Sequence, residues 1–377
     1  MIISQINLQK HFGGGEVYTS FLCHALDKLG VTTKLLIHPR AKFWTQLGLP
    51  DSTILIETLN FAHAEGALSK DIRWAIGHGP LPPQLIDHIH DMGGLATAIA
   101  HMPVQGRRPD SFKNHDMVFA VSGWVLNGLL ENGINAWPEP LYGVASILRP
   151  QAQSTIRKTS HYDWDLRKGR DRMLSWFEPF VEAVRPHPIY HKKNGLTLGI
   201  VSRITPIKQF PLLFNHIAPI LAKHNDIYLE IFGSGGFGSI RDLKRALAPI
   251  QDRVRFWGQQ SNIASIYQNI DYLLTGLPEK EALGLNVIEA QFCGIPVLAP
   301  KAPPFIETIL DGRTGYLYTD PRLDNGQELD RLLNRIKTEG LHPDPTLASE
   351  HLHRFSFESF TDRLAPIVQW AQKAATS

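Results

Sequence analysis

Short apolar runs alternate along the chain with longer segments whose apolar positions recur at helical spacing. The first pair is an apolar run at Ile2–Ile6 and an amphipathic segment from Glu16 to Leu29. Such runs are typical of buried parallel strands, and the longer segments are typical of the helices that connect them. The pattern therefore predicts βαβ units. It places further strands at Thr33–Ile37, Leu95–Ala100 and Met117–Val121, and a helix at Val125–Glu131.

The alternation stops at Pro186–Asn194, a polar segment with two prolines that we interpret as a linker, and then starts again. The chain thus contains two α/β domains, and ligands of such folds bind at the loops that follow the strands. Beyond the linker, strands are predicted at Leu196–Val201, Tyr228–Phe232, Val254–Phe256, Tyr272–Thr275 and Pro296–Ala299. Helices are predicted at Pro211–Ala222, Ile240–Ala248 and Leu285–Phe292.

Composition agrees with two domains and excludes several classes of protein. A length of 377 residues suits two packed domains, and 38 basic against 36 acidic side chains argues against a dedicated nucleic-acid binder. Cys23 and Cys293 are the two cysteines, so no disulfide framework is implied. Met1–Lys10 has no targeting pattern, and the apolar stretch Met117–Leu130 is too short to span a bilayer. We expect a cytoplasmic protein.

Two glutamates, Glu281 and Glu289, lie eight residues apart around the start of the predicted helix at 285–292. In a continuous helix they would be about 12 Å apart, which spans the two sugars on either side of a diphosphate. The N–H groups of Leu283, Gly284 and Leu285 form a helix N-terminus, which favours an anion. The alternative is an ordinary helix with one exposed and one capping glutamate.

Two cations follow the strand at 196–201. Arg203 and Lys208 are five residues apart at the carboxyl end of that strand. Cations placed there can neutralise a leaving diphosphate that would otherwise need a metal ion. Taken alone they could equally be ordinary exposed side chains, so the hypothesis depends on their combination with the two glutamates.

A glycine-rich loop, Gly233-Ser-Gly235-Gly-Phe-Gly238, follows the strand at 228–232 and formally matches the dinucleotide-binding fingerprint. A dehydrogenase also needs an acidic residue at the end of the next strand, where this chain has Arg255 and Trp257. The loop is better interpreted as a turn that a ligand or the other domain approaches closely.

Together these motifs resemble the retaining GT-B glycosyltransferases of family 4. The resemblance rests on Gly13-Gly14-Gly15-Glu16, Arg203 with Lys208, Gly233-Ser234-Gly235, and Glu281-x7-Glu289, in this order. It implies two facing Rossmann-like domains with a crevice between them. The acceptor-binding domain would be residues 1–185, with an extra segment at 146–185. The nucleotide-sugar-binding domain would be 195–350, and 351–377 would form a C-terminal helix, around Phe357–Ala374, that packs back across the interface.

The resemblance also implies residue roles. Arg203, Lys208 and the backbone of 283–285 would bind the donor diphosphate, Glu289 the ribose hydroxyls, and Glu281 the donor-sugar hydroxyls. His101, at the end of a buried strand, would lie beside the donor sugar; the alternative for it is a core histidine. Five glycines would line the crevice: Gly13, Gly14, Gly15, Gly233 and Gly235.

The implied activity is retaining transfer of a hexose-type sugar from a nucleoside diphosphate to a hydroxyl of a glycan or lipid-linked acceptor. Neither a metal nor another cofactor is expected, and bacterial surface polysaccharide or glycan synthesis is the implied pathway. Two departures from the family pattern, Ala282-Leu283 after the first glutamate and Ala145 in place of an aspartate, leave an alternative open. The alternative is a non-catalytic protein that binds nucleotides or sugars.

The segment 146–185 lies outside the family pattern. Asp163-x-Asp165 suggests a metal-binding GT-A site, but such a pair should end an apolar strand, and this one lies in a polar segment. From Arg149 to Arg172 seven basic and three acidic side chains leave a local charge of +4, and an aromatic stripe at helical spacing follows. We interpret the segment as an added helix packed on the first domain. An anionic acceptor site and contact with the inner membrane surface through 149–184 stay open.

Three further histidines invite a functional interpretation. His88 and His90 would diverge on a helix, so a solvated face is favoured over a metal site. His78 lies between two glycines at the expected end of a strand and borders the expected crevice.

Overall fold

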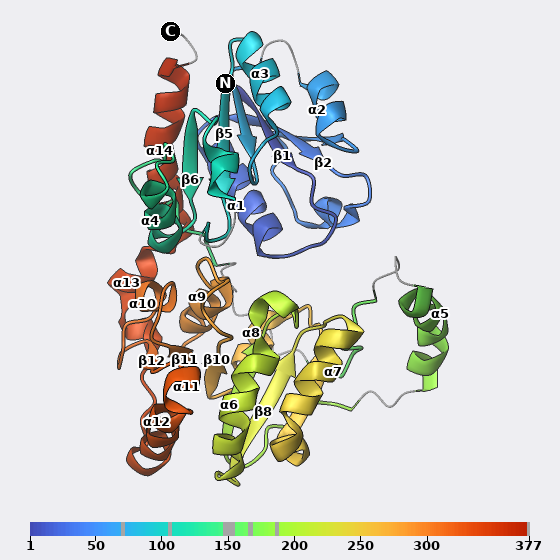
Figure 1. The fold of residues 1–377 in the computed structure, drawn as a ribbon, viewed down its shortest axis with the longest axis vertical. Helices are drawn as coiled ribbons and strands as arrows, with labels where there is room; N and C mark the ends of the chain where they lie inside the picture. The colour runs from blue at the N-terminus through green and yellow to red at the C-terminus, as the bar shows by residue number, and fades with distance from the viewer. Residues whose placement is uncertain (69–71, 105–107, 146–154, 165–168, 185–187, 375–377) are drawn as a thin grey trace. The chain divides into compact units, whose positions relative to one another are not determined.

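The computed structural model describes residues 1–68, 72–104, 108–145, 155–164, 169–184 and 188–374. The chain forms two compact units, one of Met1–Ser146 with His353–Ser377 and the other of Ile147–Leu352. Each unit is built around its own sheet of six parallel strands (Figure 1).

The sheet of the first unit has the strand order β3-β2-β1-β4-β5-β6, so the order reverses between β1 and β4. Its strands are β1 (Ile2–Asn7), β2 (Thr32–Ile37), β3 (Thr53–Glu57), β4 (Trp74–Gly77), β5 (Leu95–Ala100) and β6 (Met117–Ala120). The helices of this unit are α1 (Gly14–Lys28), α2 (Phe61–Ala67), α3 (Pro83–Asp91), α4 (Gly123–Glu131) and α14 (Phe357–Ala374). The predicted helices at 16–29 and 125–131 correspond to α1 and α4. Strand β3 was not predicted, and of β4 only its end, before His78, was expected.

The second sheet repeats this order with its own strands, as β9-β8-β7-β10-β11-β12, and reverses between β7 and β10. Its strands are β7 (Leu196–Val201), β8 (Ile227–Phe232), β9 (Val254–Gly258), β10 (Tyr272–Leu274), β11 (Val297–Pro300) and β12 (Gly315–Tyr318). The helices are α5 (Gly169–Val184), α6 (Phe210–Ala222), α7 (Phe237–Ala246), α8 (Ile263–Tyr267), α9 (Leu285–Phe292), α10 (Phe305–Thr308), α11 (Pro321–Asp324) and α12 (Gln327–Glu339), with α13 (Ser349–His353) at the boundary.

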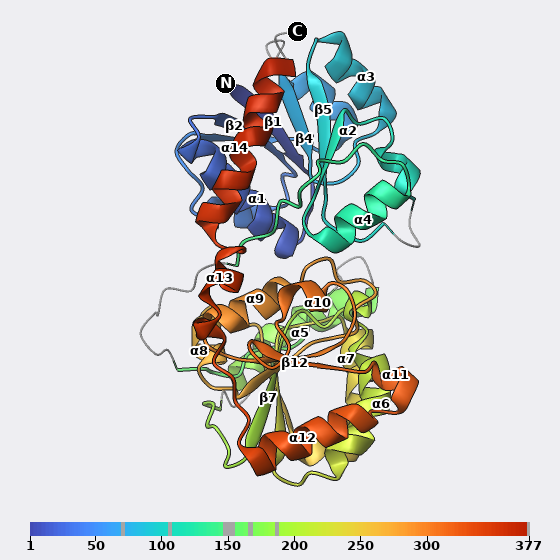
Figure 2. The ribbon, with the colours of Figure 1, turned by 90° about the vertical axis from the view of Figure 1, so that its left-hand side faces the viewer.

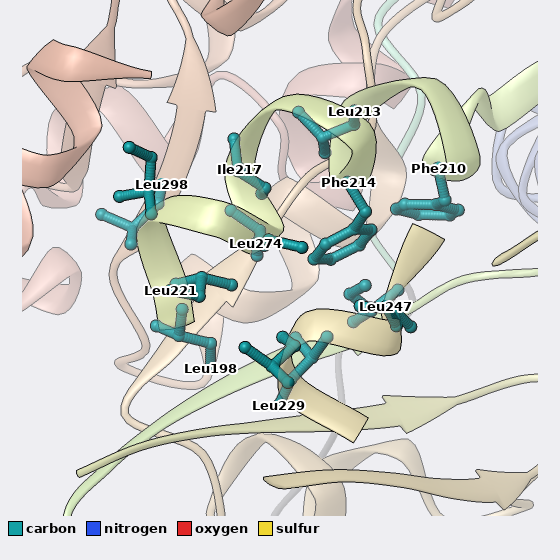
Figure 3. Close-up of a cluster of buried hydrophobic side chains, with 14 of the residues drawn as sticks. Leu198, Phe210, Leu213, Phe214, Ile217, Leu221, Leu229, Leu247, Leu274 and Leu298 are labelled. Atoms are coloured by element: carbon teal, nitrogen blue, oxygen red, sulfur yellow. The ribbon is translucent and has the colours of Figure 1, made fainter. Parts of the chain in front are cut away.

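The core of the second unit lies between its sheet and helix α6. Phe210, Leu213, Phe214 and Ile217 recur at helical spacing on α6 and are fully buried (Figure 3). They pack against strand residues such as Leu229. This packing fixes α6 on the sheet, and with it the loop between β7 and α6 that carries the two predicted cations.

The C-terminal segment returns to the first unit. Helix α14 begins and ends where the sequence predicted, and it lies along α1 (Figure 2). Phe360 on α14 meets the ring of Tyr18 on α1 edge-on, with 5.5 Å between the ring centroids. Burial of both rings ties the end of the chain to the helix that follows the first glycine loop.

The domain boundary differs from the prediction. The second unit begins at residue 147, so the extra segment expected in the first domain belongs to the second. Its described part hydrogen-bonds to the second sheet, for example from the amide of Thr159 to the carbonyl of Trp257. Residues 186 and 187 of the proposed linker lie outside the described residues. Its described part, 188–194, also belongs to this unit, because Tyr190 is buried and its amide donates to the carbonyl of Ile156. Prolines occur in linkers, but they also occur in short irregular segments that pair with the edge of a sheet.

Candidate functional site

Lys208 and Glu281 form the centre of the candidate site in the second unit. Lys208 follows β7 and Glu281 follows β10, the two neighbouring strands between which the strand order reverses. Their side chains are joined by a direct salt bridge between Nζ and Oε2, and both are largely buried. The fold thus brings together two predicted residues 73 positions apart, at the place where open α/β sheets bind ligands.

The backbone holds the Lys208 loop close to the end of β10. A Cβ atom on Gly276 would lie 2.5 Å from the carbonyl oxygen of Lys208, so only glycine fits there. Gln209, the next residue, has a left-handed φ of 53° and leads directly into α6. The position of the Lys208 side chain is therefore set by close backbone packing.

The N-terminus of α9 lies directly after Glu281. Gly284 is the N-cap with a φ of 81°, a conformation that favours glycine, and the helix begins at Leu285. Asn286 in the first turn donates from Nδ2 to the carbonyl of Val201 at the end of β7, 3.1 Å away. The first amides of a helix have no partner within the helix, so this end of α9, beside a lysine, suits an anionic ligand.

The two glutamates are not on one continuous helix, as the 12 Å spacing assumed. Glu281 closes a turn with Pro278, residues 282–284 are irregular, and only Glu289 belongs to α9. Tyr267 donates its hydroxyl to Glu289 Oε2 at 3.2 Å, and burial beside that carboxylate holds the pKa of Tyr267 well above its usual value. Glu289 is thus oriented by a buried tyrosine, one turn beyond the helix N-terminus.

Arg203 has a carboxylate neighbour that sequence reasoning did not anticipate. Its guanidinium lies 3.4 Å from Asp163 Oδ2, and both side chains are about half exposed. Asp163 belongs to the pair considered for a GT-A metal site; Asp165 lies outside the described residues. No cluster of three potential metal-binding side chains occurs in the part of the chain that the structure describes. There, Asp163 pairs with a cation.

The second glycine loop is packed against the chain's own backbone. A Cβ on Gly233 would lie 2.0 Å from the carbonyl oxygen of Ser202, and one on Gly235 would lie 2.2 Å from that of Ile204. The amide of Gly235 donates to the carbonyl of His161, and its carbonyl accepts from the amide of Asp163. These glycines are required by packing between three backbone segments of the same unit.

The first glycine loop is different. Gly13 is the N-cap of α1, the helix begins at Gly14, and a Cβ on Gly15 would meet nothing within 4 Å. Glu16 and Thr19 in the first turns of α1 are buried, and Asn7 at the end of β1 donates to the hydroxyl of Thr19 at 2.9 Å. Packing within the unit does not require a glycine at 15, so the open space there is available to a ligand.

His101 follows β5, and its Nε2 lies 3.0 Å from Nδ1 of His78, which follows β4. Burial lowers the pKa of His101 to about 4, and burial and the neighbouring His101 hold the pKa of His78 well below its usual value. Both rings are therefore neutral near pH 7. The ring of Tyr18 meets that of His101 edge-on at 4.9 Å. Sequence reasoning placed His78 at a strand end but missed its contact with His101.

The other two histidines considered from the sequence lie on α3. His90 is exposed and pairs with Asp116 at 3.0 Å, and His88 is partly exposed, with the buried Ile89 between them.

The chain contains two parallel six-stranded sheets of identical strand order. The second has a helix N-terminus that favours an anion where its strand order reverses. This combination defines the GT-B class of fold. Residues 185–344 match the family model of the glycosyl transferases group 1. The crystal structure of Anabaena HepE in complex with UDP-glucose is similar over 98% of this chain and 99% of that one, with a TM-score of 0.70 and 16% identity. Together these findings show the GT-B fold, and they show similarity to the glycosyl transferases group 1 over residues 185–344.

Curated relatives match over shorter regions. The chain is 36% identical over 118 residues to the N-acetyl-alpha-D-glucosaminyl L-malate synthase of Bacillus anthracis, which is 31% of this chain and 30% of that protein. It is 29% identical over 199 residues to the D-inositol 3-phosphate glycosyltransferase of Segniliparus rotundus, which is 51% of this chain and 43% of the relative. The matches thus span less than half the length of these relatives.

Among the helices that the structure describes, none has the length and apolar character needed to cross a bilayer.

Proposed function

We propose that the protein is a retaining glycosyltransferase that moves a sugar from a nucleoside-diphosphate sugar to an acceptor hydroxyl. The observation that carries the proposal is the pairing of Lys208 with Glu281 beside the N-terminus of α9. This arrangement offers a cation and helix amides to a diphosphate, and a carboxylate to the hydroxyls of the sugar attached to it.

Each predicted residue has a role in this proposal. Lys208, Arg203 and the amides of 283–285 bind the diphosphate, and Glu289 accepts hydrogen bonds from the ribose hydroxyls. Glu281 accepts hydrogen bonds from the donor sugar once the diphosphate competes for Lys208. His101 contacts a hydroxyl of the same sugar.

The reaction replaces one bond to the anomeric carbon with another. The bond from that carbon to the phosphate oxygen breaks, the acceptor oxygen bonds to the same face, and the departing phosphate oxygen takes the acceptor proton. No covalent intermediate with the protein is part of the proposal. Lys208, Arg203 and the helix amides stabilise the negative charge on the leaving diphosphate, and this is the main catalytic contribution.

The donor is proposed from the comparisons, and the acceptor and pathway from the resemblance seen in the sequence. The solved structure of HepE contains UDP-glucose, and we therefore propose a UDP-sugar as the donor. For the acceptor we propose a hydroxyl of a glycan or lipid-linked molecule, in bacterial surface polysaccharide or glycan synthesis, as the motifs shared with the retaining GT-B glycosyltransferases imply. Since Lys208, Arg203 and α9 supply the positive charge, the proposal needs no metal, and activity should persist in EDTA.

The proposal is tested by nucleotide release from a panel of nucleoside-diphosphate sugars. Lys208→Ala should weaken nucleotide binding and lower turnover, whereas Glu281→Gln should lower turnover and leave nucleotide binding largely intact. Lys223→Ala is the matched control, because Lys223 pairs with Asp330 at 2.9 Å at the other end of α6. If Lys208→Ala and Lys223→Ala behave alike in both assays, the assigned diphosphate site is wrong.

A non-catalytic nucleotide- or sugar-binding protein is the alternative, and the same experiment separates the two. A ligand that binds only the folded state raises the melting temperature whether or not it reacts. A UDP-sugar that raises the melting temperature with no UDP released over hours, at every acceptor tried, would favour the binding protein.

Helix α5 supports a further proposal, peripheral contact with a membrane surface. Met173, Trp176, Phe177 and Phe180 lie at helical spacing on it and are 49–70% exposed. Trp and Phe side chains favour the interface between water and lipid, and the sequence before the helix is basic. Vesicles of anionic phospholipid should sediment the protein. Replacing Trp176 and Phe180 by serine should abolish this, whereas Leu323→Ser, at a residue 81% exposed, should not. If the parent, the variant with serine at Trp176 and Phe180, and Leu323→Ser sediment equally with vesicles, the membrane contact through α5 is excluded.

A further inference from the structure

His78 occupies a turn that the local sequence builds tightly. It follows β4 in Gly77-His78-Gly79, where a Cβ on Gly77 would lie 2.6 Å from the carbonyl oxygen of Gly79, and Gly79 has a φ of 133°. Glycine is therefore needed on both sides of the histidine. This turn points the imidazole of His78 back toward β1 and β5, the two strands on either side of β4.

Both nitrogens of His78 are within hydrogen-bond distance of buried or partly buried groups. Nε2 lies 2.8 Å from Gln5 Oε1, and Nδ1 lies 3.0 Å from His101 Nε2. The amide nitrogen of Gln5 faces Cys23 Sγ at 3.4 Å, which directs Gln5 Oε1 toward His78. A carbonyl oxygen accepts only, so His78 carries its proton on Nε2.

A neutral imidazole that donates from Nε2 has an acceptor at Nδ1. Two groups lie 3.0 Å from this nitrogen, Thr19 Oγ1 and His101 Nε2. The hydroxyl of Thr19 also lies 2.8 Å from the carbonyl of Gly15, which can take its proton. Because Thr19 can donate to Gly15 instead, Nδ1 of His78 is left to accept the proton on Nε2 of His101.

We propose that His78 is a positioning residue for His101: it accepts the Nε2 proton of His101, fixes the ring, and leaves Nδ1 of His101 as a hydrogen-bond acceptor for a substrate hydroxyl. The ring of His101 is partly exposed, and within the described ranges no side chain or backbone group hydrogen-bonds to its Nδ1. The lowered pKa values of both histidines agree with this arrangement, because it needs two neutral rings.

The arrangement specifies which partner His101 recognises. A neutral histidine fixed with Nδ1 unprotonated accepts a hydrogen bond from an alcohol and repels an anion. This rests on the proposed function, in which the partner is a sugar hydroxyl. The position of the proton does not rest on it and is measured separately.

The proton position is measured by two-bond 1H–15N correlation spectra of the full chain labelled with 15N-histidine, near pH 7.5. The signals of the two histidines are assigned with His78→Asn and His101→Asn. We expect both in the Nε2–H form. Finding His101 in the Nδ1–H form would overturn the proposal, whatever the enzyme assay shows.

The kinetic test compares two replacements of His78. Asparagine places its Oδ1 near the position of Nδ1 and retains an acceptor for His101, whereas leucine removes it. We expect His78→Leu to lower kcat about tenfold or more, and His78→Asn to stay within about threefold of the parent, since one hydrogen bond to a positioned group is at stake.

His115→Leu controls for loss of a buried, hydrogen-bonded histidine elsewhere in the same unit. His115 accepts from the amide of Leu81 at 3.0 Å, and its ring lies against that of Phe112. The His115→Leu variant should have a lower melting temperature and an unchanged kcat per folded molecule. If His78→Asn and His78→Leu lose the same activity, or if His115→Leu loses as much kcat as His78→Leu, His78 is a structural residue only. If the parent has no transferase activity while the spectra show the expected protons, the proposed function fails and the proton arrangement stands.

Discussion

Replacing Gly235 by alanine tests whether the second glycine loop serves packing or a ligand. The added Cβ would lie 2.2 Å from the carbonyl oxygen of Ile204, about 1.2 Å short of the 3.4 Å at which ordinary contact begins. The φ of Gly235 is outside the left-handed region, so the cost is steric. The two backbone segments must therefore separate.

The separation has a calculable cost. The amide of Ile204 donates to Ser234 at 2.8 Å, the amide of Gly235 donates to His161 at 3.0 Å, and the amide of Asp163 donates to Gly235 at 2.9 Å. Each such bond contributes about 1 kcal/mol net, and alanine recovers about 0.5 kcal/mol by restricting the unfolded chain. We expect Gly235→Ala to lower the free energy of unfolding of the second unit by about 2.5 kcal/mol.

Gly238→Ala is the control from the same motif, because a Cβ there meets nothing within 4 Å and the residue lies in α7. It should raise stability by about 0.5 kcal/mol, as alanine favours the helix. Urea unfolding measures both variants, and hydrogen exchange should quicken at the amides of 204 and 235 in Gly235→Ala alone. A Gly235→Ala protein with parental stability that no longer binds UDP would refute the packing argument and show that a ligand approaches this glycine.

Three further outcomes are expected. The pKa of His101 falls from 6.5 in the unfolded chain to about 4 in the folded protein. Between pH 4 and 6.5 the unfolded chain therefore binds one more proton than the folded protein does. The stability that depends on this group is complete above about pH 6.5 and is lost as the pH falls, by ~1.4 kcal/mol near pH 5.5. Urea unfolding should find the total loss on acidification smaller in His101→Asn, with the contribution of His78, whose pKa is also lowered, remaining. Asp163→Asn should tighten UDP binding up to about fivefold in calorimetry by releasing Arg203 from an exposed ion pair; weaker binding would contradict this. Tyr267→Phe should weaken UDP binding about threefold or more by freeing Glu289, and unchanged affinity would remove that role.

Much of the fold could be predicted because its longer elements carry a clear pattern. The strands β1, β5 and β7 and the helices α6 and α9 were found at or near their observed bounds. The strands β3 and β12, which were missed, are the edge strands of their sheets, and several of their residues are partly exposed. Shortness alone does not explain the misses, because β6, β10 and β11 have only three or four residues and were predicted. The order of strands could not be deduced, since it depends on which faces pack together.

The candidate site was predictable residue by residue but not as a set of contacts. Position at the end of a strand is visible in the sequence and singled out His101, Arg203 and Lys208, whereas Glu281 was singled out by its spacing from Glu289. The pairing of Lys208 with Glu281 depends on β7 and β10 being neighbours, and that of Arg203 with Asp163 depends on an irregular segment crossing the sheet end. Single-residue bridges, such as that between Tyr162 and Gly235, leave no periodic signal.

The same geometry explains why a glycine motif of dehydrogenase type does not make this second unit a dinucleotide-binding domain. Glu230 on β8, the strand before the motif, is fully buried, accepting from Arg255 on β9 and from Trp257 Nε1 at 2.6 Å. The end of β9 is also covered, because Gly258 packs against the backbone of the segment at 159–160. Asp163, which bonds to Gly235 through its backbone, pairs its carboxylate with Arg203. A dinucleotide-binding domain needs an acid at the end of the strand after the motif, and β9 carries Arg255 and Trp257 there. The carboxylate that the proposed function gives to the ribose is Glu289, on the far side of β7 in helix α9.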